Sequence, residues 1–96
     1  MRYRARKDTN QDDIVKALRQ MGVSVQTLHK LGDGVPDLLC GFRKRNLLME
    51  IKDGKRSPSE QRLTEDESEW HDSWRGQVCI VRSVDDAVRV MEKVGI

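Results

Sequence analysis

Two acids and a lysine stand out as residues that could do chemistry. Asp37 follows a proline at the start of one apolar run, and Glu50 and Lys52 close the next run in a Glu-Ile-Lys sequence. Two carboxylates held side by side repel each other unless a cation neutralises them. Mg²⁺ suits such a place because it prefers carboxylate and carbonyl oxygens together with retained water. Asp37, Glu50 and the backbone carbonyl of Ile51 therefore predict a partial metal shell, in which Lys52 could orient a water or offset negative charge.

A purely structural interpretation of the same residues stays open. Glu50 and Lys52 would then form a solvated salt bridge on an exposed sheet face, and Asp37 would only cap a turn. The Glu-x-Lys spacing is common and does not decide between the two. The Gly-Val-Pro-Asp sequence that ends at Asp37, together with a polar pair closing an apolar strand, favours the metal site.

The elements that must position these residues are predicted to be two antiparallel strands. Residues 37–42 and 46–52 are apolar runs joined by a basic turn at residues 43–45, a separation typical of a β-hairpin. In the second strand, the period of two places Glu50 and Lys52 on the same face. The opposite face is apolar and consists of Leu47, Met49 and Ile51.

A helix and a short strand are predicted before the hairpin. The helical spacing of Ile14 and Leu18 predicts an amphipathic helix, which Thr9 or Asn10 could cap. Residues 23–28 alternate in polarity, as in a short strand.

After the hairpin, the sequence predicts a loop, two helices and a further strand. Residues 53–62 contain glycine and proline and are expected to form the loop. Thr64 and Glu67 have the spacing of a capping box that begins a helix. Residues 77–82 predict a buried strand, and Ser83 caps a last helix. The order of helix, three strands, helix, strand and helix predicts an α/β fold, with helices packed on a mixed sheet.

Charge is segregated along the 96 residues, which have room for a single domain, residues 1–96. The formal net charge is only +2, but the basic residues form three clusters. One lies at residues 43–45 and another between Lys52 and Arg62. The third is a basic N-terminal arm of residues 1–8, which contains Arg2, Arg4, Arg6 and Lys7. One such cluster is often plain solvated surface, whereas three together favour a polyanionic partner.

The composition indicates a folded protein inside the cell. Hydrophobic residues make up 36% of the chain, which is above the disordered regime. Cys40 and Cys79 lie in apolar runs without CxxC spacing, so we expect small core residues and neither a zinc site nor a disulfide. No segment has the length of a membrane span or the form of a secretory signal. We therefore expect a cytoplasmic protein that does not bind membranes.

Several short motifs follow one another along nearly the whole chain. They are Asn10-Gln11, Gly34-Val-Pro-Asp37-Leu-Leu, Glu50-Ile-Lys52, Leu63-Thr64, Trp70-His71 and Gln77-Val-Cys-Ile-Val. In this order and spacing, the chain resembles the virus-type replication-repair nuclease (VRR-NUC) domain of the PD-(D/E)xK superfamily. The resemblance is to the short stand-alone form that is typical of phage genomes.

The resemblance implies an αβββαβα core and hydrolysis of DNA phosphodiester bonds with Mg²⁺ or Mn²⁺. It assigns the catalytic roles to Asp37, Glu50 and Lys52. Stand-alone members imply a homodimer acting on branched DNA such as four-way junctions, in the manner of a Holliday-junction resolvase. The alternative from another class is a non-catalytic DNA-binding module that retains the nuclease fold. Intact Asp37, Glu50 and Lys52 favour the enzyme, because binding alone needs no acids directed at a polyanion.

Two further acids are candidate accessory residues. The family usually has a glutamate early in the first helix, where this chain has Asp13, which either reaches the metal or only stabilises the helix dipole. The family usually presents a glutamine in the next helix, where this chain has Glu67. A capping box explains Glu67 without function, and a place beside the metal stays open. Glu67 is expected to share an inward helix face with Trp70 and Trp74.

The remaining candidates concern DNA and a second subunit. Besides the N-terminal arm, the expected phosphate contacts are Lys55, Arg56 and Ser57. His71 is either a general base or, more often for a lone histidine, structural. Trp70 and Trp74 are expected in the core or at a dimer surface. A symmetric homodimer is expected because so short a chain has a thin core, with the hairpin around Phe42 and Leu47 as the first candidate interface.

Overall fold

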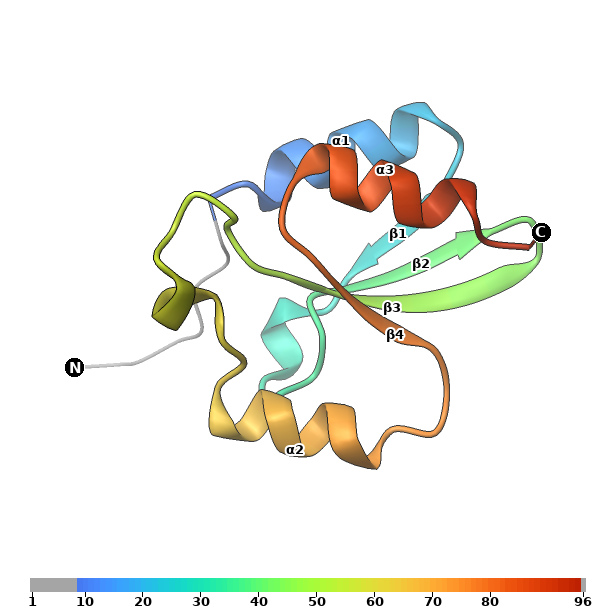
Figure 1. Cartoon of the computed structure of the whole chain (residues 1–96). Helices are drawn as coiled ribbons and strands as arrows, with labels where there is room; N and C mark the ends of the chain where they lie inside the picture. Colours follow the sequence, from blue (N-terminus) through green and yellow to red (C-terminus); the bar gives the residue numbers. More distant parts are fainter. Residues whose placement is uncertain (1–8, 96) are drawn as a thin grey trace.

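The computed structural model, which describes residues 9–95, has a four-stranded mixed sheet with helices on both faces (Figure 1). Its elements are, in order, α1 (Gln11–Gln20), β1 (Ser24–Thr27), the 3-10 helix η1 (His29–Leu31), β2 (Leu38–Phe42), β3 (Arg45–Ile51), the 3-10 helix η2 (Pro58–Gln61), α2 (Glu65–Ser73), β4 (Val78–Val81) and α3 (Val84–Glu92). The predicted order of helix, three strands, helix, strand and helix is confirmed. The basic arm of residues 1–8 lies outside the described residues.

The sheet has the order β1-β2-β3-β4. The predicted hairpin is confirmed, because β2 and β3 pair antiparallel with Leu38 opposite Met49 and Cys40 opposite Leu47. β4 pairs parallel to β3, since the chain crosses over through α2 before it returns to the sheet. The last residue of β3 therefore lies at the end of the sheet where the crossover towards α2 begins.

The hairpin turn has two residues and not the predicted three. Arg43 and Lys44 have φ values of 52° and 66°, the left-handed conformation that lets a two-residue turn match the twist of the strands. The Arg43 guanidinium donates to the carbonyls of Glu92 at 2.9 Å and Val94 at 3.2 Å. These bonds tie the turn to the end of α3.

The main core lies between the sheet and the pair of helices α1 and α3, which pack side by side on one face (Figure 1). As the period of two predicted, β3 contributes its apolar side, Leu47, Met49 and Ile51. Cys40 is fully buried here and Cys79 packs against it, which confirms their role as core residues. Burial raises the pKa of the Cys40 thiol to about 11 and of Cys79 to about 12, so neither is a thiolate at neutral pH.

The opposite face of the sheet is covered by α2 (Figure 1). The loop before β2 lies against the first turn of this helix at Gly34, which has a φ of 81°. A Cβ at Gly34 would overlap the backbone carbonyl of Asp66. A glycine is therefore needed for the loop to approach α2 this closely.

The start of α1 is held by long-range contacts. Asn10 is at the N-cap position, but its side chain makes no capping bond within residues 9–95. Its amide donates instead to the carbonyls of Lys52 at 3.4 Å and Arg82 at 3.3 Å, and Thr9 donates to Asp53. The capping prediction for Thr9 and Asn10 is therefore wrong, because the ends of β3 and β4 compete for these polar groups.

The last helix begins as predicted, since the Ser83 hydroxyl accepts the N–H of Asp86 at 3.0 Å. Within residues 9–95, no helix is long and apolar enough to span a membrane.

Candidate active site

Asp37 lies directly before β2 and reaches across to β3. Its Oδ2 atom accepts the N–H of Ile51 at 2.7 Å. The N–H and C=O of one residue in a strand point to the same side. The carbonyl of Ile51 therefore faces the side of β3 on which Asp37 lies, as the predicted metal shell requires.

Glu50 lies beside Asp37, and the two carboxyls share a hydrogen bond. Glu50 is only 2% exposed. Burial, and next the negative charge of Asp37, raise the pKa of Glu50 to about 10. Burial also raises the pKa of Asp37, although the N–H of Ile51 opposes this. Without a bound cation, Glu50 therefore holds a proton at neutral pH.

Lys52 is on the same side of the strand as Glu50 and is 8% exposed. Its Nζ atom lies 3.9 Å from Oε2 of Glu50 and 2.7 Å from Oε1 of Glu67. A solvated salt bridge on an open sheet face is therefore the wrong interpretation. Buried charges need close partners, and Glu67 on α2 supplies one.

Glu67 forms the predicted capping box and also pairs with Lys52, while a place beside a metal stays a prediction. Its Oε1 atom accepts the Thr64 N–H at 2.8 Å, and the Thr64 hydroxyl accepts the N–H of Glu67 at 3.2 Å, so the capping box is confirmed. The same Oε1 atom accepts the ammonium of Lys52. Burial works against ionisation of Glu67, but the bonds from Lys52 and Thr64 outweigh it and hold the pKa below its usual value.

His71 belongs to the same cluster, which the sequence did not establish. Its Nε2 atom lies 4.0 Å from Oε1 of Glu50. Burial lowers the pKa of His71, which favours the neutral imidazole. The signal in the sequence was the spacing of four residues from Glu67, which places both side chains on one helix face.

Asp13 lies elsewhere. It is exposed on α1, the layer across the sheet from α2, and lines a surface hollow of about 640 Å³ with Asp53, Lys55 and Arg82. Of the two interpretations, this position favours stabilisation of the helix dipole over contact with a metal.

The loop after β3 is exposed and carries the expected phosphate contacts. Arg56 already pairs with Glu60 at 3.3 Å and Asp53 at 3.8 Å. Ser57 and Glu60 form a capping box at the start of η2. Acidic side chains of the protein therefore compete with DNA for Arg56 and Ser57. Lys55 is the strongest remaining candidate for a phosphate contact.

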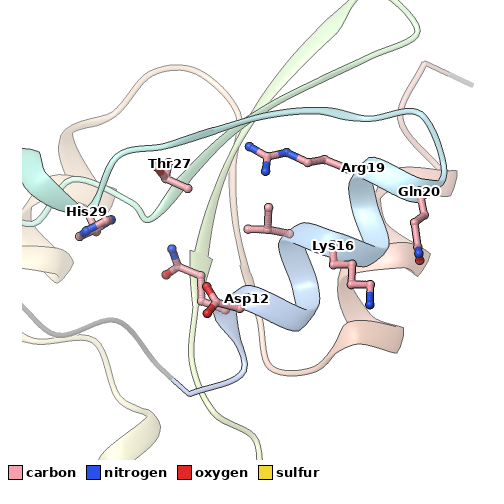
Figure 2. Close-up of a pocket in the computed structure, with 8 residues that line it drawn as sticks. Asp12, Lys16, Arg19, Gln20, Thr27 and His29 are labelled. Atoms are coloured by element: carbon pink, nitrogen blue, oxygen red, sulfur yellow. The ribbon is translucent and has the colours of Figure 1, made fainter.

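A basic hollow of about 570 Å³ lies between α1 and the segment that follows β1. Figure 2 shows it with Lys16, Arg19 and His29, and with one acid, Asp12. The backbone connects its edge to the candidate site, because His29 lines the hollow and the N–H of its neighbour Leu28 donates to the main-chain carbonyl of Asp37 at 2.8 Å. This hollow was not predicted from the sequence, since its residues come together only when α1 packs beside β1.

The apolar residues expected at a dimer surface are only partly available. Leu47 is a core residue, and Phe42 is half-buried against the core beneath the Arg43 guanidinium, so the hairpin offers little free apolar surface and its interface stays a prediction. Trp74 is 45% exposed and stacks on Trp70 with ring centroids 4.5 Å apart. The core interpretation is therefore wrong for Trp74, which stays available as surface.

The donor groups around Asp37 fit a divalent cation. Within residues 9–95, no three His, Cys, Asp or Glu side chains form a ready-made metal cluster. The oxygens of Asp37, Glu50 and the Ile51 carbonyl are nevertheless the ligand types that Mg²⁺ prefers. Oε1 of Glu50 is buried and has no hydrogen-bond partner in the described part of the chain, and a cation would satisfy it.

Comparisons with protein-family models, curated proteins and solved structures found no match for this chain. The resemblance to the VRR-NUC domain stays a prediction from the sequence motifs. The geometry of the site is the basis on which a function can be proposed.

Proposed function

We propose that this protein is an endonuclease of the PD-(D/E)xK type that uses Mg²⁺ or Mn²⁺ to hydrolyse phosphodiester bonds in structured DNA. The observation that carries the proposal is the buried carboxyl pair of Asp37 and Glu50 with Lys52 beside it. Stability alone does not call for such a pair, because burial and repulsion both disfavour it. Groups with strongly shifted pKa values in this setting are typical of functional sites.

The residues of the site divide the chemistry between them. Asp37, Glu50 and the carbonyl of Ile51 would hold the cation, which lowers the pKa of a bound water and offsets charge on the scissile phosphate. Lys52 is placed to orient that water or to stabilise the phosphate as its charge develops. Glu67 holds the ammonium of Lys52 in position.

The basic hollow supports DNA as the substrate. Lys16 and Arg19 line it on α1, and Lys55 lies in the loop that leaves β3. Contacts of this kind bind phosphates and position a strand without reading its bases. Branched DNA such as a four-way junction is the proposed substrate. A homodimer would provide two sites related by symmetry, with Trp74 at the interface.

The test is incubation with linear, flapped and four-way DNA, with and without Mg²⁺ or Mn²⁺. The wild type is expected to cleave only with metal, while Asp37→Asn and Lys52→Ala should be slower by about 100-fold or more. Asn at position 37 keeps an acceptor for the N–H of Ile51, so the loss of cleavage is separated from misfolding. Asp13→Asn is the matched control and should cleave normally.

The outcome also separates the alternatives. Salt-dependent binding of DNA by the wild type without cleavage under any metal would favour a non-catalytic DNA-binding module. If no salt-dependent binding of DNA is found, both the nuclease and the DNA-binding module are refuted. Light scattering tests the homodimer, since a monomer that nicks a single strand would leave a nuclease but not a junction resolvase.

A further inference from the structure

His71 faces Glu50 across the space between α2 and β3. Its Nε2 atom and Oε1 of Glu50 are 4.0 Å apart, with the two side chains 12% and 3% exposed. Both atoms are buried, and neither has a hydrogen-bond partner among residues 9–95. Buried polar atoms are nearly always paired, so two unpaired atoms that face each other point to something bound between them.

The distance between the two atoms fits a shared metal ion. A direct hydrogen bond would bring them to about 2.7–3.2 Å. Two ligands that each lie about 2.1 Å from one ion are separated by at most about 4.2 Å. The observed 4.0 Å lies within this limit, and the two side chains would close by about 0.6 Å to reach the separation of about 3.4 Å at a tetrahedral ion.

We propose that His71 is a metal ligand, and that His71 and Glu50 together hold a position selective for first-row ions that bind imidazole, such as Co²⁺ or Zn²⁺, over Mg²⁺. Mg²⁺ takes oxygen ligands and water, whereas imidazole nitrogen suits the later first-row metals. The proposal deepens the proposed function, on which it rests: Glu50 serves both the oxygen-lined position beside Asp37 and this one.

The surroundings of His71 hold it ready for this role. Glu67 and His71 lie one helical turn apart, so the same packing of α2 directs both towards β3. The Trp70 ring meets the imidazole edge-on at 6.0 Å between centroids, which restricts the ring. Lys52 lies by the other oxygen of Glu50 and is paired with Glu67 at 2.7 Å. Its charge is therefore offset on the side away from His71.

The experiment is a titration of the full chain with Co²⁺ and, separately, with Mg²⁺, followed by calorimetry and by visible absorption of the cobalt. His71→Asn is expected to lower Co²⁺ affinity by about 10-fold or more and to remove the absorption of nitrogen-bound cobalt. Its Mg²⁺ affinity should change less than about two-fold, since Mg²⁺ does not favour nitrogen. His29→Asn, at the other of the 2 histidines, is the control and should bind both metals like the wild type.

Equal Co²⁺ affinity in His71→Asn and the wild type would overturn the proposal and leave a water between the two atoms. If His71→Asn fails to fold, imidazole ¹⁵N spectra of the wild type with Zn²⁺ decide: a shift of the His71 nitrogens supports it, and unchanged nitrogens refute it. A failure of the proposed nuclease function can be told apart from a failure of the proposed metal position. Co²⁺ binding that depends on His71, without DNA cleavage, keeps the metal position and removes the nuclease. If the protein cleaves DNA with Mg²⁺ but binds Co²⁺ equally well without His71, the nuclease is supported and the metal position at His71 is refuted.

Discussion

The Nζ atom of Lys52 lies 2.7 Å from Oε1 of Glu67, so a lysine at the end of β3 is held by a carboxylate from α2. The same oxygen accepts the N–H of Thr64 at 2.8 Å. One oxygen atom therefore both begins the helix and positions the lysine of the candidate site.

This double role predicts different costs for two substitutions. Glu67→Gln keeps an acceptor for the N–H of Thr64 but loses the charge that faces Lys52, and should lower the free energy of unfolding by about 1 kcal/mol. Glu67→Ala also removes the cap and should cost about 1 kcal/mol more. Urea denaturation of both variants measures the difference. Equal losses would show that the amide does not replace the carboxylate in the capping box.

The raised pKa of Glu50 predicts a dependence of stability on pH. The pKa is about 10 in the folded protein against an ordinary value of 4.5, so the stabilisation is complete below about 4.5 and is lost as the pH rises towards 10. Glu50→Gln cannot lose a proton. Without divalent metal, it should therefore become more stable relative to the wild type between about pH 5 and pH 9.

Urea midpoints at several pH values, with chelator present, check this expectation for Glu50. Glu60→Gln is the control, because Glu60 is exposed and its pKa is lowered by Ser57, so no such gain at high pH is expected. A difference between Glu50→Gln and the wild type that does not change with pH would mean that Glu50 is ionised in the folded protein. Mg²⁺ should stabilise the wild type, since it binds the folded state.

The contact between Gly34 and α2 predicts a specific effect of a single methyl group. Gly34→Ala places a Cβ on the carbonyl of Asp66 and also forces a side chain into positive φ. Gly32→Ala has the same backbone problem, with a φ of 67°, but its Cβ would meet nothing within 4 Å. We expect a loss of about 1 kcal/mol for Gly32→Ala and clearly more for Gly34→Ala, measured by thermal unfolding. Equal losses of stability in the two variants would show that α2 shifts at little cost to make room for the added methyl group.

The basic hollow predicts a change in the salt dependence of DNA binding. Lys16→Gln with Arg19→Gln should weaken binding to all DNA sequences similarly, and should reduce the slope of log affinity against log salt by about 2 if each residue contacts one phosphate. Fluorescence anisotropy at several salt concentrations measures the slope. Arg89→Gln on α3 is the control for loss of charge alone. A slope like that of the wild type would direct attention to Lys55 and the N-terminal arm.

The sequence was sufficient where the relevant contacts are local. The period of two placed Glu50 and Lys52 on one face, and the hairpin brought Asp37 to their side. The spacing of Thr64 and Glu67 predicted the capping box. These relationships depend on a few neighbouring residues, whose geometry is fixed by the regular backbone.

The sequence was insufficient where distant segments compete for one group. Helical spacing indicates that Glu67 and His71 share a face, but not that this face covers Glu50, which depends on the packing of α2. The Asn10 amide had a suitable place for a helix cap, yet the carbonyls of Lys52 and Arg82 attract it from far along the chain.

The mixed pairing of β3 has a consequence for the order of folding. β3 meets β2 through a two-residue turn, whereas it meets β4 only after the crossover through α2. Contacts close in sequence form sooner than those that need a long loop to close. The hairpin therefore brings Asp37 and Glu50 together before α2 delivers Glu67 to Lys52. At neutral pH, we expect Glu50 to take up its proton only when α2 docks and buries it, because burial is the main cause of its raised pKa.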